Sequence, residues 1–207
     1  VPISISGSPV DAWFFASPNI EPQRSDQFSA GVNALFADQA LELSAEAFYK
    51  HNINTMDFKE NPGFVFDDAD REGLLRFGTS YSYGTELMLR YDFDRVGGWL
   101  SYTWSRAIYD IPELNGGEPY RSPLNHDHSV NFVLSCDISK RVSASADWVY
   151  YSGAPTTFPT GRFAYGGSYT SIYSSRNEDS MPDYHRMDLS LTVKSKRRAE
   201  GRPWGSE

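Results

Sequence analysis

The amino-acid sequence predicts an all-β fold, an antiparallel up-and-down meander of about seven long strands, from three observations. Apolar and polar residues alternate with period two along most of the chain, and no stretch has the 3.6-residue spacing of an amphipathic helix. The alternating segments run to about 9–14 residues, whereas strands of globular proteins have about 5 or 6. Short and long connections alternate strictly between them. Strands of about 9–11 residues suit a tilted crossing of a bilayer, so the pattern favours a transmembrane β-sheet.

Seven segments show the alternation, and each has one apolar face. The clearest is 41–49, where Leu43 and Ala45 oppose Glu42 and Ser44, with Phe48 as the exception. The polar faces carry charges of both signs, which must meet water or one another. The first segment is the weakest because several of its residues are small. In chain order the alternation is read at 28–36, 41–49, 86–93, 100–105, 130–137, 142–150 and 187–193, within strands expected to run to about 9–14 residues.

The connections give independent support. Short turns are expected at 37–40, 94–98 and 138–141, and long loops at 54–77, 110–125 and 152–182. All three long loops then leave the same end of the sheet, as in bacterial outer-membrane barrels, whose turns are periplasmic and whose loops are external. Aromatic residues gather near the strand ends, where amphipathic rings suit the headgroup boundaries: Phe48, Tyr49, Tyr81, Tyr83, Tyr91, Phe93, Tyr150 and Tyr151.

Composition limits the alternatives. The 207 residues include 19 Lys and Arg against 27 Asp and Glu, a net charge of −8, which argues against a nucleic-acid binder. The aromatic content of 15% argues for a folded chain. The single cysteine, Cys136, excludes an internal disulfide framework. The longest apolar run is 13–16, too short for a membrane-spanning helix, and no export signal follows Val1.

Six segments resemble, in family order, motifs of the barrels of TonB-dependent outer-membrane receptors. His126 departs from the pattern, because the family commonly has Arg or another polar residue there. The segments are 17–25 (SPNIEPQRS, like NPNLKPE-S), 83–89 (YGTELML, like GxE), 98–107 (GWLSYTWSRA, like GWxSYTxSxA), 126–132 (HDHSVNF, like DxxHxxN), 152–161 (SGAPTTFPTG, like SGxPxTxPxG) and 182–190 (PDYHRMDLS, like YxRxDL).

The resemblance implies that residues 1–207 are the C-terminal part of such a barrel, of a Bacteroidetes-like type, and an open segment of a large transmembrane β-barrel of about 22 strands. The plug domain, the TonB-box peptide and the closing strands are expected outside this sequence. The implied function is import of a scarce solute across the outer membrane of a Gram-negative bacterium. The implied partners are outer-membrane lipid, an unknown solute, and the TonB complex, which the absent N-terminal part would contact.

Other motifs point to no catalytic, metal or cofactor site, so the chain is not expected to be an enzyme. An acidic patch, Asp67, Asp68, Asp70 and Glu72, lacks the glycine turn of an EF-hand and is expected to be a solvated loop. His126 and His128 lie two apart on one expected strand face and lack an evident third ligand, so packing is favoured over metal. Cys136 falls on an apolar face and is expected to pack there.

If the apolar face meets lipid, the polar face lines the barrel. The candidates for ligand contact there are Glu46, Glu86, Arg90 and Asp147, for which structural pairing is the alternative; Glu42, Asp92, Asp137 and Asp188 share this face. Aromatic residues of the long loops are further possible contacts: Phe64, Phe66, Tyr120, Phe163, Tyr165, Tyr169 and Tyr173.

Two other functions stay open from the sequence. One is a passive outer-membrane barrel or adhesin scaffold, which an N-terminal plug domain in the full-length protein would exclude. The other is a soluble carbohydrate-binding β-sandwich. A sandwich requires Leu87, Leu89, Trp104, Phe132 and Leu189 to share a buried core, whereas a barrel wall leaves them on one outer face.

Overall fold

The computed structural model describes residues 2–4, 11–13, 17–38, 40–59, 72–165 and 167–194. Seven long strands dominate the described part: β3 (Arg24–Phe36), β4 (Leu41–Phe58), β5 (Leu75–Phe93), β6 (Val96–Asp110), β8 (His128–Ser139), β9 (Val142–Tyr151) and β14 (Tyr184–Val193). The shorter elements are β1 (Pro2–Ser4), β2 (Asp11–Trp13), β7 (Tyr120–Arg121), β10 (Pro155–Thr156), β11 (Pro159–Tyr165), β12 (Ser168–Tyr173), β13 (Asp179–Ser180), and the 3-10 turns η1 (Glu72–Leu74) and η2 (Asn115–Gly117).

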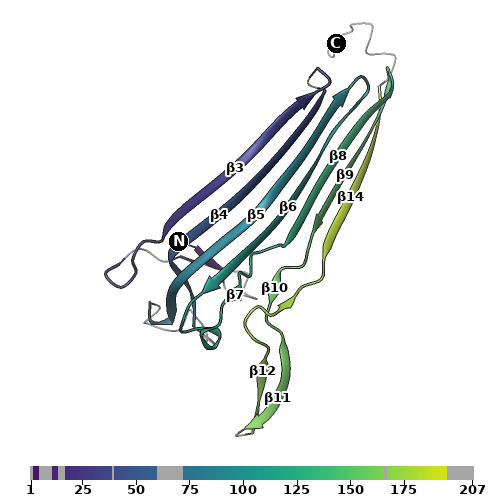
Figure 1. Cartoon of the computed structure of the whole chain (residues 1–207). Coiled ribbons are helices and arrows are strands. Elements are labelled where there is room, and N and C mark those ends of the chain that lie inside the picture. The colour runs from purple at the N-terminus through teal and green to yellow at the C-terminus, as the bar shows by residue number, and fades with distance from the viewer. Residues whose placement is uncertain are drawn as a thin grey trace, which may run out of the picture.

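The long strands form one antiparallel sheet in the order β3, β4, β5, β6, β8, β9, β14, which confirms the predicted meander (Figure 1). Within the described residues β3 pairs only with β4 and β14 only with β9, so the sheet is open at both edges. β4, β5 and β6, with 18, 19 and 15 residues, are longer than predicted. Strands of this length exceed the bilayer requirement and extend beyond it at one end.

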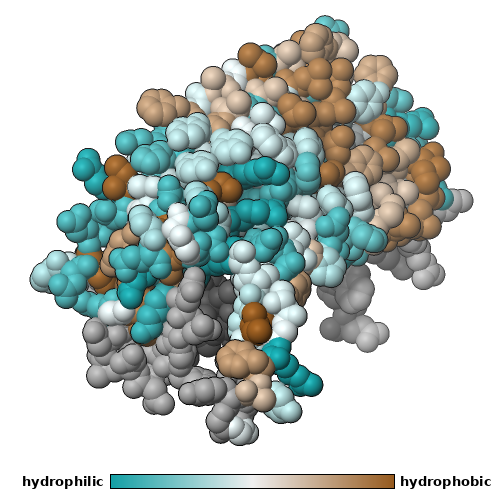
Figure 2. Space-filling model, turned by 60° about the horizontal axis from the view of Figure 1, so that its bottom comes forward, coloured by the Kyte–Doolittle hydropathy of each residue, from teal (hydrophilic) through white to brown (hydrophobic). Residues whose placement is uncertain are grey.

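The register places the alternating apolar residues on one face. A single row across the sheet takes one residue from each long strand: Ala34, Leu43, Leu89, Leu100, Phe132, Trp148 and Met187. Leu87 is 47% and Leu189 is 75% exposed, which shows that no second layer covers this face in the described part of the chain. Figure 2 shows hydrophobic side chains gathered in a broad area away from the hydrophilic loop end. The β-sandwich is therefore excluded, since none of the five residues that would form its core is buried.

The short turns all lie at the end of the sheet opposite the long loops (Figure 1). β5 and β6 are joined by Asp94 and Arg95 alone, and β8 and β9 by Lys140 and Arg141. Ala37 and Asp38, in the turn after β3, have φ of 50° and 53°. Two successive positive φ values are typical of the hairpin turns whose twist matches that of the flanking strands. The predicted alternation of short and long connections is confirmed.

The position of Phe48 on the polar face has a packing explanation. Phe48 is the register partner of Gly84 on β5. A Cβ built on Gly84 would lie 2.9 Å from the Phe48 ring and would overlap the carbonyl oxygen of Trp104. The ring thus covers a glycine that the close approach of β6 requires, a pairing that stabilises glycine within sheets.

Among the described residues, buried hydrophobic side chains occur only at the loop end. One cluster packs the end of β4 and the start of β5 against the segment that precedes β3. Its members are Ile20, Met56, Phe58, Leu74 and Leu75. A second lies in the loop after β6: Ile111, Leu114 and Tyr120. The long strands contribute no buried apolar side chain to a core in their central parts, which is the arrangement of a wall that lipid must cover.

Candidate functional site

The three long connections leave the sheet at one end, and the described contacts at that end make it the candidate site. The first loop joins β4 to β5, the second joins β6 to β8 and contains β7, and the third, 152–183, joins β9 to β14. The third loop contains two small sheets, β10 with β13 and β11 with β12, that the sequence did not predict.

Residues from the end of β4 and from the second and third loops meet in a buried polar group, here called the Asp57 cluster: Asp57, Tyr120 and Arg176. The Tyr120 hydroxyl donates to Asp57 Oδ2 at 2.7 Å, and Arg176 Nη2 lies 2.9 Å from the same oxygen. The other oxygen, Oδ1, accepts the backbone N–H of Phe58 at 2.7 Å. The Arg176 guanidinium lies 5.2 Å from the centroid of the Tyr120 ring. Asp57 and Tyr120 are only 7% and 3% exposed. These contacts at both carboxylate oxygens therefore offset the cost of burying the charge of Asp57.

Burial raises the pKa of Tyr120 well above its ordinary value, and the neighbouring Asp57 carboxylate raises that pKa further. The Tyr120 hydroxyl therefore keeps its proton and remains a donor to Asp57 at all physiological pH values.

A β-bulge brings Asp57 to this position. The pairing of β4 with β5 shifts between Ile53 and Thr55, at Asn54, whose φ is 59°. Before the bulge the even-numbered residues of β4 share the polar face; after it Thr55 and Asp57 do, as partners of Gly78 and Arg76. A bulge redirects a side chain in this way, and asparagine adopts positive φ more readily than most residues.

The bulge also explains why the predicted start of the first long loop, at Asn54, is wrong. The strand continues to Phe58, and β5 begins at Leu75 instead of after Phe77. The one-residue shift interrupts the alternation of apolar and polar residues at Asn54. The pattern therefore ends there, although the strand continues.

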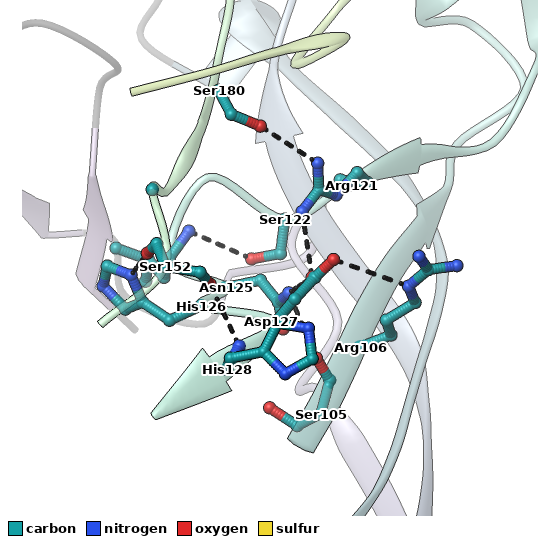
Figure 3. A network of polar contacts seen from close by, with 12 residues as sticks. Ser105, Arg106, Arg121, Ser122, Asn125, His126, Asp127, His128, Ser152 and Ser180 are labelled. Carbon is teal, nitrogen blue, oxygen red and sulfur yellow. Dashed lines mark hydrogen bonds and ion pairs between the residues drawn. The ribbon is translucent and has the colours of Figure 1, made fainter. Parts of the chain in front are cut away.

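A second polar group, the Asp127 network, comprises Asp127, Arg106, Arg121 and Asn125 (Figure 3). Asp127 Oδ1 accepts from Asn125 Nδ2 at 2.6 Å and lies 2.9 Å from Arg121 Nη2, while Oδ2 lies 3.6 Å from Arg106 Nε. Arg106 and Arg121 are register partners of Tyr83 and Ile108, so this network lies on the apolar face, above the band of apolar residues. It neutralises charges where a lipid-facing wall would enter the headgroup region.

The two histidines are held separately (Figure 3). His126 Nδ1 lies 2.6 Å from the carbonyl oxygen of Ser152, and its ring packs on Tyr151. His128 Nδ1 lies 2.9 Å from the Tyr102 hydroxyl, and its ring stacks on Tyr102. Tyr151 belongs to the polar-face set and Tyr102 to the apolar-face set, so the histidines do not share one face as the sequence suggested. No cluster of three potential metal ligands occurs among the described residues.

The four predicted lumenal candidates lie on the polar face, away from the Asp57 cluster. Glu46 and Glu86 are direct register partners. Arg90 and Asp147 share a row that also contains Glu42 and Asp188. All four side chains are exposed, and none has a hydrogen bond or ion pair within the described part of the chain. Like charges placed opposite each other are unfavourable, so the Glu46 and Glu86 pair lowers sheet stability in isolation. Their role in ligand contact stays a prediction.

The other predicted residues divide between the described part and the remainder. Phe64, Phe66, Asp67, Asp68, Asp70 and the side chain of Tyr165 lie outside the described residues. Glu72 accepts a hydrogen bond from Asn19 Nδ2 at 2.9 Å, and Cys136 is half-buried on the apolar face. Tyr120 is buried in the Asp57 cluster and is therefore no exposed loop aromatic. Phe163, Tyr169 and Tyr173 are exposed on β11 and β12.

A single-layer antiparallel sheet with one continuous apolar face, short turns at one end and long packed loops at the other defines a wall segment of a transmembrane β-barrel. The family described as TonB dependent receptor-like, beta-barrel matches residues 5–199. The chain belongs to this family of TonB-dependent receptors. The Bacteroidetes-like character stays a prediction.

Solved structures of such receptors share the fold. The ferric-catecholate import receptor Fiu from K12 E. coli matches with a TM-score of 0.59 and 16% identity, over 94% of this chain and 24% of that one. The ferripyoverdine receptor of the Pseudomonas aeruginosa outer membrane, bound to ferripyoverdine, matches with a TM-score of 0.56 and 11% identity, over 83% of this chain and 21% of that one. A complex of FpvAI with pyocin S2 matches with a TM-score of 0.56 and 12% identity, over 83% and 22%.

The chain therefore spans about a quarter of the length of the receptors that it matches. The comparison with curated proteins finds no match. The family and the matched structures are receptors and importers, generally not enzymes. Among the described residues, no helix has the length and apolar character to span a membrane.

Proposed function

We propose that this chain is a barrel segment of a TonB-dependent outer-membrane receptor that imports a scarce solute across the outer membrane of a Gram-negative bacterium. The observation that carries the proposal is the sheet itself, whose apolar row crosses all seven long strands without a covering layer. Lipid covers that face, and the polar face lines the lumen. The long loops lie outside the cell, and the short turns lie in the periplasm.

The solute class that we infer is a ferric siderophore. Support comes from two matched receptors, one described as a ferric-catecholate importer and one solved with ferripyoverdine bound. The exposed aromatic residues of β11 and β12 offer flat surfaces at the loop end. In the full-length receptor, of which residues 1–207 form a partial barrel domain, coupling to TonB belongs to a segment N-terminal to this one.

Iron uptake tests the proposal. The full-length receptor is expressed in a strain that lacks its own siderophore receptors, in a TonB-containing and a TonB-deficient background, and uptake of radioactive iron is measured with ferric catecholate and with ferripyoverdine. We expect uptake that requires both the receptor and TonB. Uptake that persists equally without TonB would indicate a passive barrel. An absence of uptake with both siderophores would contradict the ferric siderophore class.

An epitope tag tests the topology. A tag inserted between Gly116 and Gly117 in the second loop should bind antibody on intact cells, because a Cβ at Gly116 would meet nothing within 4 Å and the turn has room. The matched control carries the same tag between Asp94 and Arg95 in a short turn, and should bind antibody only after lysis. The reverse pattern would show that the long loops are periplasmic.

A further inference from the structure

The β11–β12 hairpin extends beyond the end of the sheet (Figure 1). Its two strands pair with each other, and no pairing with another strand occurs in the described part of the chain. Phe163, Tyr169 and Tyr173 are 48%, 74% and 52% exposed, so the hairpin presents aromatic rings to its surroundings. An isolated two-stranded hairpin is at best marginally stable and has no fixed direction of its own, so contacts at its base must set where it points.

The base of the hairpin is a short stem followed by a bend. β10 and β13 form the stem, with Pro155 opposite Ser180 and Thr156 opposite Asp179. The bend between β12 and β13 contains Arg176 and Asn177. Asn177 Nδ2 donates to the carbonyl oxygen of Arg121 at 2.8 Å, and its backbone N–H donates to Thr157 Oγ1 at 2.9 Å. These bonds attach the bend to β7 and to the stem.

Arg176 attaches the same bend to two further parts of the chain. Its backbone N–H donates to Asn115 Oδ1 in the second loop at 2.9 Å. Its guanidinium reaches Asp57 at the end of β4 and covers the Tyr120 ring. Among the described residues, this is the one ion pair that joins the third loop to an earlier part of the chain. Because its side chains are largely buried, water screens it little, and loss of either partner leaves a buried charge unpaired.

We propose that Arg176, held by Asp57 and Tyr120, is a positioning residue that fixes the direction in which the β11–β12 hairpin extends beyond the loop end of the sheet. The role of Arg176 in hairpin position rests on the geometry alone. The role of the hairpin in ligand capture rests, in addition, on the proposed function. Loss of the Arg176 side chain frees the bend from β4 and from the second loop's tyrosine, and the hairpin then samples several directions.

The distance between two spin labels tests the position of the hairpin. In full-length receptor with Cys136→Ser, labels are attached through Ser171→Cys on β12 and Asp26→Cys on β3, and the distance distribution is measured by pulsed electron paramagnetic resonance without ligand. We expect one narrow distribution for the parent protein and a distribution at least about twice as broad for Arg176→Gln, because the hairpin then has several populated directions. An unchanged distribution in Arg176→Gln would overturn the proposal.

Three further variants distinguish a change in the position of the hairpin from a general loss of folded structure. Arg162→Gln is the matched control, since Arg162 lies 5.1 Å from the Tyr169 ring within the same loop and forms no described ion pair, and it should leave the distribution narrow. Arg176→Lys should give a distance distribution of intermediate width, because lysine keeps the charge and loses the planar contact with Tyr120. If Arg176→Gln does not fold, Tyr120→Phe removes one hydrogen bond to Asp57 and should broaden the distribution to a smaller extent; an unchanged distribution there would contradict the proposal.

Uptake kinetics test the role in ligand capture separately. If Arg176→Gln lowers the population with a correctly placed hairpin to about one fifth, the half-saturating ferric siderophore concentration rises about fivefold, while the maximal rate per folded receptor is unchanged. A broadened label distribution with unchanged half-saturation would overturn the role in capture. Absence of uptake in the parent receptor would instead contradict the proposed function, and the label distances would still test the position.

Discussion

Replacing Leu89 with arginine should lower the free energy of unfolding of the full-length receptor in lipid vesicles by about 2–4 kcal/mol. Leu89 lies on the apolar face of β5, between its register partners Leu43 and Leu100. On this face the aromatic residues Tyr83 and Phe93 of the same strand flank the apolar residues, and Leu89 lies near the middle of the band between them. A guanidinium there must enter hydrocarbon or distort the bilayer. Urea titration monitored by tryptophan fluorescence measures the change.

Met88 provides a control on the neighbouring residue of the same strand. It is the register partner of Ser44 and Ser101, and is 38% exposed on the opposite, polar face. Met88→Arg should therefore change the free energy of unfolding by less than about 0.5 kcal/mol, as for an ordinary exposed substitution. Equal losses in Leu89→Arg and Met88→Arg would show that the two faces do not differ in their contact with lipid, and the assignment of the apolar face would be wrong.

The sequence predicted the sheet well because the relevant signals are local. Alternation in residues such as Leu87 and Leu89 records which face meets lipid, and short turns such as that at Asp94 have few possible geometries. In an antiparallel meander each strand pairs with its neighbour along the chain, so the order of strands follows from their existence. The predicted second strand ends too early because the bulge at Asn54 shifts the alternation by one residue without ending β4.

The candidate site was not predictable in the same way. Asp57, Tyr120 and Arg176 are separated by 63 and 56 positions, and only the packing of the loops brings them together. Tyr120 was expected among the exposed loop aromatics, since sequence does not reveal that a carboxylate lies opposite its hydroxyl. Asn54 does not reveal the bulge in advance, because Asn33 and Asn131 also lie within strands and are paired in regular register. The four polar-face candidates follow from the period alone, and none of them, Glu46 and Glu86 included, forms a hydrogen bond or ion pair with another described residue.

Gly153→Ala should give the second large effect, a loss of about 3 kcal/mol in the free energy of unfolding, at the upper end of the range for overpacking. Gly153 is buried where β9 leads into the third loop, and a Cβ there would overlap the carbonyl oxygen of Met181. Backbone atoms cannot rotate away as a side chain can, so the loop base must separate. The same urea titration measures this loss.

Two hydrogen bonds at the loop base would be lost with it. Met181 N–H donates to the carbonyl oxygen of Ala154 at 2.8 Å, and Gly153 N–H donates to Asp183 Oδ1 at 2.9 Å. The Tyr150 hydroxyl also donates to Asp183, and this bond, with the Gly153 bond, lowers the pKa of the Asp183 carboxyl below its ordinary value. Asp183 is therefore ionised at neutral pH, and separation of the loop base removes a donor from a charged acceptor, which costs more than a neutral bond.

Gly161→Ala is the matched control, because it lies in the same loop and a Cβ there meets only the flexible end of Ile172 at 3.9 Å. It should change the free energy of unfolding by less than about 0.5 kcal/mol. Limited proteolysis distinguishes a local from a global effect: Gly153→Ala should expose the third loop to protease while the strands of the barrel remain intact. If both alanine variants resist protease equally and unfold at the same urea concentration, the close approach of Met181 to Gly153 does not hold the loop base together.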